Sequence, residues 1–299
     1  MWQAKTISKI RAGGNAVAEA ERVTLRGAGL DLAADRWDPD GPARGEVFLL
    51  HGGGQTRGSW KHTGRRLAAR GWTTFALDAR GHGDSDWSDT GDYTADAHLA
   101  DVRAAVSARP APPVLVGASM GGYAALLAAG EHSGIAAGLV LVDIAVSAEP
   151  AGLARVQGFM HAGLDGFDSV EAARAAVSAY NPHRAVPPSS RGLLRNLRER
   201  DGRWYWHWDP AMIDERNLAA QAPERRERRA RRAAGNVAVP TMLVRGAQSD
   251  IVTPAAAVEL LELIPSLRYV DIAGTGHMVS GDDNDVFTEA VVTFLDAMP

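Results

Sequence analysis

The chain has 299 residues, of which 32 are basic and 36 acidic, so its formal net charge is -4 at neutral pH. That balance gives no electrostatic support for binding to nucleic acid or to an anionic membrane. The sequence contains no cysteine, which excludes disulfides, thiolate chemistry and cysteine-ligated zinc.

The N-terminal segment is polar, and we expect residues 1–21 to form a loosely attached arm. This segment has scattered charges and no apolar run of signal-peptide length. Nowhere does the sequence approach the roughly 20 consecutive apolar residues that a membrane-spanning helix needs. We therefore expect a cytoplasmic protein without a membrane partner.

From residue 22 onwards, short apolar runs alternate with helical patterns. The runs are continuously apolar, as expected for central parallel strands that are covered on both faces. The predicted strands are residues 46–50, 73–77, 113–116, 139–142, 241–244 and 267–272. The predicted helices are residues 93–108, 120–130, 255–263 and 285–298. This alternation predicts an α/β fold in which helices flank a mostly parallel central sheet.

One long segment interrupts the alternation. Residues 147–235 contain no predicted strand, but they show a helical pattern at 169–180 and proline-marked turns. We interpret this segment as a helical lid inserted over the strand ends. The predicted core then comprises residues 22–146 and 236–299.

The strongest chemical signal is Gly117-Ala118-Ser119-Met120-Gly121, which lies between a predicted strand and a predicted helix. A strand–turn–helix of the form Gly-x-Ser-x-Gly exposes the serine hydroxyl at the top of a sheet. The amides at the start of the helix can stabilise a developing oxyanion. Ser119 is therefore the predicted nucleophile.

A glycine-rich loop, His51-Gly52-Gly53-Gly54, follows the first strongly apolar strand. Successive glycines let the backbone approach a substrate oxygen closely. We predict that the amides of Met120 and Gly53 form the oxyanion hole, with Gly54 as the second choice in the loop.

The general base is predicted to be His277, which lies in a glycine-rich turn after the last strand. Two aspartates could orient it. Asp250 follows the strand at 241–244 and is favoured by chain order, whereas Asp143, at the end of the preceding strand, is the alternative. Either carboxylate could hold the imidazole in its productive tautomer.

With these residues identified, the sequence from about residue 22 onwards resembles the α/β-hydrolase family. The strand–turn–helix at Ser119, called the nucleophile elbow, resembles that of its lid-bearing esterases, lactonases and cofactor-free haloperoxidases. The His51–Gly54 loop resembles the oxyanion loop of the family. The turn from Asp78 to Ser85 resembles one that these members carry. The resemblance places the acid after the strand that follows the lid, at Asp250, or in a minority of members at Asp143. A serine at the elbow disfavours the alkyl-enzyme chemistry of members with an aspartate nucleophile.

The predicted lid contains a dense aromatic cluster and one basic run. Candidate substrate-binding residues are the tryptophans at 204, 206, 208 and 60, although each could equally pack against the core. The run from Arg225 to Arg232 includes Glu227 and is interpreted as a solvated helix face. No residue spacing suggests a metal site, and no cofactor is predicted.

The predicted reaction is hydrolysis of a small-molecule carboxylic ester or lactone, apolar or aromatic, through an acyl-enzyme on Ser119. The same residues could support hydrolysis of a carbon–carbon bond or transfer of an acyl group to peroxide. A ligand-binding receptor on a hydrolase scaffold is the alternative from another class. The oligomeric state is left open.

Overall fold

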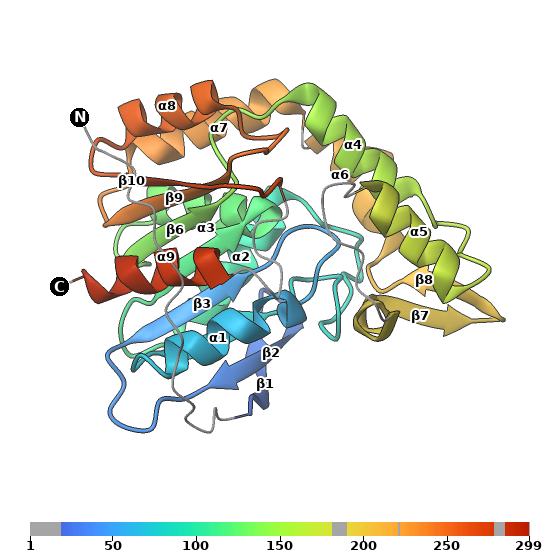
Figure 1. The fold of residues 1–299 in the computed structure, drawn as a ribbon, viewed down its shortest axis with the longest axis horizontal. Helices are drawn as coiled ribbons and strands as arrows, with labels where there is room; N and C mark the ends of the chain where they lie inside the picture. The colour runs from blue at the N-terminus through green and yellow to red at the C-terminus, as the bar shows by residue number, and fades with distance from the viewer. Residues whose placement is uncertain (1–18, 181–189, 221, 278–284, 299) are drawn as a thin grey trace.

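The computed structural model describes residues 19–180, 190–220, 222–277 and 285–298, and it consists of a twisted sheet covered by helices on both faces (Figure 1). Most of the predicted N-terminal arm, residues 1–18, lies outside the described residues. The arm's last predicted residue already begins the first strand, β1 (Glu21–Arg26).

The central sheet has eight strands in the order β1-β2-β4-β3-β5-β6-β9-β10. All six predicted strands are confirmed, as β3 (Glu46–Leu50), β4 (Thr73–Leu77), β5 (Val114–Ala118), β6 (Gly138–Val142), β9 (Thr241–Gly246) and β10 (Arg268–Ile272). These six pair in parallel. The mostly parallel α/β sheet is therefore confirmed, and the carboxyl ends of its strands meet along one edge.

The sequence did not predict β1 and β2 (Asp31–Trp37), which add antiparallel strands beside β4. Burial alternates along β1, and along most of β2. Strands near the edge of a sheet need only one apolar face, so they lack the continuous apolar runs that identified the central strands.

Two apolar layers enclose the sheet. On one face lie α1 (Lys61–Ala68) and α9 (Asp285–Asp296), packed around Trp37, Trp60 and Leu67. On the other face lie α2 (Ala95–Ser107), α3 (Ser119–Glu131), α7 (Pro223–Gly235) and α8 (Pro254–Leu263). α3 is buried along most of its length, which fixes the position of the serine at its start.

Most of the segment between β6 and β9 projects beyond the carboxyl ends of the strands, whereas α7 lies over the sheet (Figure 1). It contains α4 (Pro150–His161), α5 (Val170–Tyr180), the 3₁₀ helices η2 (Ser190–Asn196) and η3 (Pro210–Ile213), and α6 (Glu215–Ala220). The expectation that it holds no strand is wrong. β7 (Leu197–Arg200) and β8 (Arg203–Trp206) form an antiparallel ribbon around a turn in which Asp201 and Gly202 both have positive φ. An Asp-Gly pair is a strong signal for such a turn.

The predicted end of the insertion at residue 235 also needs correction. α7 packs on α3 as part of the core: Ala230, Ala233 and Ala234 are fully buried, and Gly130 leaves no room for a Cβ against Ala233. The insertion therefore ends before α7 begins.

Candidate active site

Ser119 occupies a strained turn between β5 and α3. Its φ of 45° lies in the left-handed region that non-glycine residues rarely adopt. A Cβ at Gly117 or Gly121 would lie about 2.5 Å from backbone oxygens of the facing segments, so both flanking glycines are needed for the close packing. Backbone strain of this kind costs on the order of 1–3 kcal/mol and persists where the surroundings enforce it.

His277 links this serine to a buried carboxylate. Its Nε2 lies 3.2 Å from Ser119 Oγ, and its Nδ1 lies 2.6 Å from Asp143 Oδ2. Because a carboxylate can only accept, Nδ1 carries the proton and Nε2 is left free to accept from the serine hydroxyl. Ser119 and His277 are thus brought together as the sequence predicts.

The preference for Asp250 as the partner of His277 is wrong, because Asp143 holds that position. Asp143 is 1 % exposed and also has positive φ, which turns the chain sharply at the end of β6. Its carboxylate accepts hydrogen bonds from Gly246 N and Ser249 Oγ besides His277. Asp250 instead forms an ion pair with Arg155 of α4.

Of the two candidate donors in the glycine loop after β3, only Gly53 has an amide without a partner among the described residues. Gly54 N–H donates to His82 Nε2 at 3.1 Å, so the second-choice donor is already occupied. Gly53 lines the cavity above Ser119, and its amide has no partner among the described residues. Met120 lies in the first turn of α3, where amides lack intrahelical acceptors. Gly53 and Met120 remain the candidate oxyanion donors.

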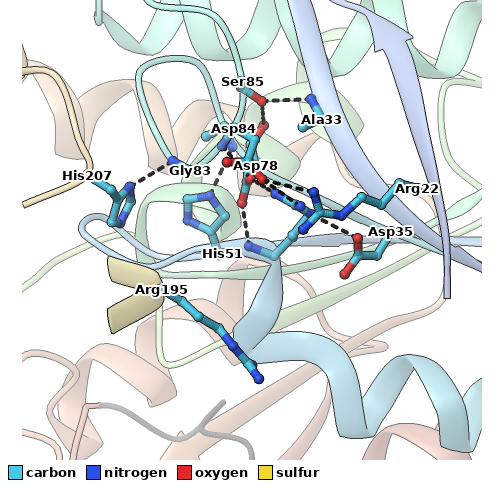
Figure 2. A network of polar contacts seen from close by, with 12 residues as sticks. Arg22, Ala33, Asp35, His51, Asp78, Gly83, Asp84, Ser85, Arg195 and His207 are labelled. Atoms are coloured by element: carbon cyan, nitrogen blue, oxygen red, sulfur yellow. Dashed lines mark hydrogen bonds and ion pairs between the residues drawn. The ribbon is translucent and has the colours of Figure 1, made fainter. Parts of the chain in front are cut away.

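Three buried histidines, His51, His82 and His207, hold this loop. His51 Nδ1–H donates to Gly52 O, while its Nε2 accepts from Ala79 N. His82 packs against His51 with ring centroids 4.9 Å apart, and against His207 at 5.7 Å. His207 comes from the insertion, and its Nδ1 accepts from Gly83 N at 2.7 Å (Figure 2). The insertion is thereby tied to the turn after β4 and, through His82, to the loop that carries Gly53 and Gly54.

Burial keeps these histidines neutral. Desolvation lowers the pKa of His51 and, more strongly, that of His82, and it lowers the pKa of His207 to about 3. The same cause lowers the pKa of His98, which lines the cavity, to about 4. Each ring is shielded from water. A charged imidazolium in these positions would lack the hydration that stabilises it in solvent.

Acidification between pH 7 and pH 5 is expected to destabilise the fold. A histidine with a lowered pKa binds fewer protons when folded than when unfolded, so stability is lost as the pH falls through about 6.5, the unfolded value. For His207 and His98 the loss amounts to about 2 kcal/mol each by pH 5. Urea unfolding at pH 7, 6 and 5 measures it, and His207→Gln should show a smaller pH dependence. Equal free energies of unfolding at pH 5 and pH 7 would contradict this.

A cavity of about 1570 Å³ opens above Ser119, between the sheet edge and the insertion. Of the four candidate tryptophans only Trp206 lines it. Trp60 is fully buried against Phe287 in the core, and Trp208 stacks on Trp206 with centroids 4.9 Å apart. Trp204 is half-buried and anchors the ribbon through Phe167. Apolar lining residues that the sequence did not single out are Phe159, Met160, Tyr180, Leu193 and Met212.

Within the described ranges, no cluster of three or more histidine or carboxylate side chains could hold a metal ion. The helices in those ranges are all too short or too polar to cross a membrane.

The family model for the alpha/beta hydrolase fold matches residues 46–283, and the chain belongs to the α/β-hydrolase family. Esterase Rv0045c of Mycobacterium tuberculosis is 32% identical over 93% of this chain and 89% of its own length. A solved structure of that esterase superposes with a TM-score of 0.71 at 27% identity, covering 94% of this chain and 93% of that one.

A second relative is the 2-(acetamidomethylene)succinate hydrolase of Mesorhizobium japonicum, 28% identical over 78% of this chain and 81% of its own length. The crystal structure of E-2-(acetamidomethylene)succinate hydrolase has a TM-score of 0.80 at 23% identity, over 93% of this chain and all of that one. Relatives of both kinds support a hydrolase of the α/β-hydrolase fold.

Proposed function

We propose that this protein is a serine hydrolase that cleaves a small carboxylic ester or lactone through an acyl-enzyme on Ser119. One observation carries the proposal. Ser119, His277 and Asp143 form a hydrogen-bonded chain, and the serine end of this chain lies in a cavity that Gly53 also lines. A base within reach of a serine hydroxyl, oriented in turn by a buried carboxylate, is the arrangement that activates a serine nucleophile.

The reaction follows from these positions. His277 Nε2 takes the Ser119 proton as Oγ attacks the carbonyl carbon, and the amides of Gly53 and Met120 donate to the oxyanion. The imidazolium, stabilised by Asp143, then gives its proton to the leaving alcohol. Water attacks the acyl-enzyme with His277 again as base, which releases the acid and restores the serine.

The insertion fits the role of a lid in this scheme. It covers the carboxyl ends of the strands (Figure 1) and contributes Phe159, Met160 and Trp206 to the cavity wall. Apolar walls of this kind exclude water and hold the acyl or alcohol part of a substrate.

A fluorophosphonate probe tests the proposal directly. We expect one adduct per chain, located by mass spectrometry on Ser119, and hydrolysis of short p-nitrophenyl esters that stops when the adduct forms. Ser119→Ala should give neither adduct nor turnover above the uncatalysed rate. An unlabelled wild-type protein with background ester turnover would refute the proposal and favour a ligand-binding receptor built on this scaffold.

A further inference from the structure

The wall of the cavity that faces α7 is basic, although the whole chain carries a net charge of -4. Among the described lining residues are two carboxylates, those of Asp96 and Glu131, and six arginines, at positions 174, 225, 226, 228, 229 and 232. Within the described residues, both carboxylates form their ion pairs with Arg229. The other arginines of this wall therefore present positive charge to the cavity. Arg225, Arg228 and Arg232 are exposed, as expected for a solvated helix face, whereas Arg226 and Arg229 of the same run are half-buried.

Arg226 is the most distinctive of these arginines. It is half-buried, and its guanidinium lies over the ring of Tyr123, 4.5 Å from the centroid. It forms no ion pair within the described part of the chain; the neighbouring Glu227 pairs with Arg231 instead. Burial lowers the pKa of Arg226, but a guanidinium stays charged at any physiological pH. A partly buried guanidinium without an anion is stabilised when a ligand supplies one.

Arg226 contacts the same helix, α3, that begins with the reacting serine. Tyr123 follows Ser119 by four residues, about 6 Å along the axis of α3, and both residues line the same cavity. The ring of Tyr123 holds one face of the guanidinium, which leaves its hydrogen-bonding edge for a ligand. Arg174 of α5 lines the same cavity from the insertion, is half-buried, and also lacks an ion pair among the described residues.

We propose that the substrate is an anionic ester, whose carboxylate or phosphate group binds to Arg226, assisted by Arg174, while its scissile carbonyl lies at Ser119. This inference rests on the proposed function and narrows its substrate class. The planar fork of a guanidinium matches two oxygens of either anion. An apolar connecting chain would lie along the cavity wall between the two sites.

Matched substrates test the proposal. Mono-p-nitrophenyl glutarate and adipate carry a free carboxylate, and their methyl-capped diesters have nearly the same shape without the charge. We expect wild-type kcat/KM to be at least tenfold higher for the charged member of each pair. In Arg226→Gln this ratio should fall about tenfold or more, chiefly through KM, and Arg226→Lys should give an intermediate ratio because it keeps the charge but loses the fork.

Arg231→Gln is the matched control. It removes one positive charge from the same helix, but Arg231 pairs with Glu227 and Glu259 and does not line the cavity. The ratio should stay at the wild-type value in this variant. An equal fall in Arg226→Gln and Arg231→Gln would overturn the proposal, because it would reveal a general field effect.

Inhibition by free glutarate and by inorganic phosphate identifies the anion. The stronger inhibitor shows whether the site prefers a carboxylate or a phosphate. Inhibition by that anion should be weaker in Arg226→Gln than in the wild type. A wild-type ratio near one, with rapid turnover of the neutral diesters, would overturn this inference and leave the serine hydrolase intact. Absence of turnover together with absence of fluorophosphonate labelling would instead refute the proposed function itself.

Discussion

Replacement of Asp143 by asparagine is expected to lower kcat for ester hydrolysis by about 10³–10⁴-fold. The asparagine amide fits the same space and can still accept from Gly246 N through its carbonyl oxygen. Its NH₂ group, however, would donate to His277 Nδ1 where the carboxylate now accepts. The imidazole proton would then move to Nε2, and His277 could no longer take the proton of Ser119.

Asp250→Asn is the matched control for this experiment, because Asp250 is the aspartate that chain order favoured. Its partner Arg155 is more than half exposed, and such ion pairs contribute at most about 1 kcal/mol. We expect kcat within about twofold of the wild type. Steady-state kinetics of both variants decide between the two carboxylates. A larger loss in Asp250→Asn than in Asp143→Asn would contradict the geometry described above.

The rate of fluorophosphonate labelling separates a catalytic loss from misfolding. A folded Asp143→Asn protein should unfold near the wild-type temperature but react with the probe much more slowly. A large fall in that temperature would mean that the lost activity reflects structure rather than the tautomer of His277.

The nucleophile and base were predictable because each is defined by a local pattern. Ser119 needs only a strand, a glycine-flanked turn and a helix, all contiguous in sequence. His277 follows the last strand in a glycine-rich turn, and every parallel strand of this sheet ends at the same edge. The fold class follows from the same continuous apolar runs.

The acid was not predictable, because two adjacent strands, β6 and β9, both end in candidates. What decides between them is backbone geometry: positive φ at Asp143 turns its carboxylate toward Gly246, Ser249 and His277. Chain order carries no information about that turn. Asp250, a few residues further beyond the end of β9, points to α4 instead.

The residues that support the site were missed for a related reason. His207 lies more than a hundred residues from Gly83, yet the two are hydrogen bonded. Likewise, Arg226 faces a cavity only because α7 returns to pack on α3. Contacts of this range depend on how the chain between β6 and β9 folds back onto the core, which no local spacing encodes.

Removal of the Arg57 guanidinium is expected to destabilise the protein by about 3–5 kcal/mol. Asp78 is fully buried, and it accepts from both the backbone and the side chain of Arg57. The same guanidinium bonds Asp35 and Asp84 (Figure 2 shows the three aspartates). In Arg57→Met the carboxylate of Asp78 would keep hydrogen bonds from backbone amides only. The guanidinium that balances its charge would be gone. Urea unfolding at pH 7 measures the loss.

Arg26→Met provides the control, since the ion pair between Arg26 and Asp31 is largely exposed and should change stability by less than about 1 kcal/mol. The double variant Arg57→Met with Asp78→Asn tests the cause. If the loss comes from an uncompensated buried charge, making Asp78 neutral should recover part of it. Additive losses in the double variant would show that shape, not charge, matters here.

This ion pair also bears on catalysis, because of where its members lie. Arg57 follows the loop that carries Gly53, and Asp78 begins the turn that carries His82, whose ring accepts from Gly54. The Arg57–Asp78 pair therefore holds together the two turns that aim the Gly53 amide. Arg57→Met, assayed well below its unfolding temperature, should lower kcat more than Arg26→Met does. Equal kcat values would mean that the histidines alone fix the oxyanion loop.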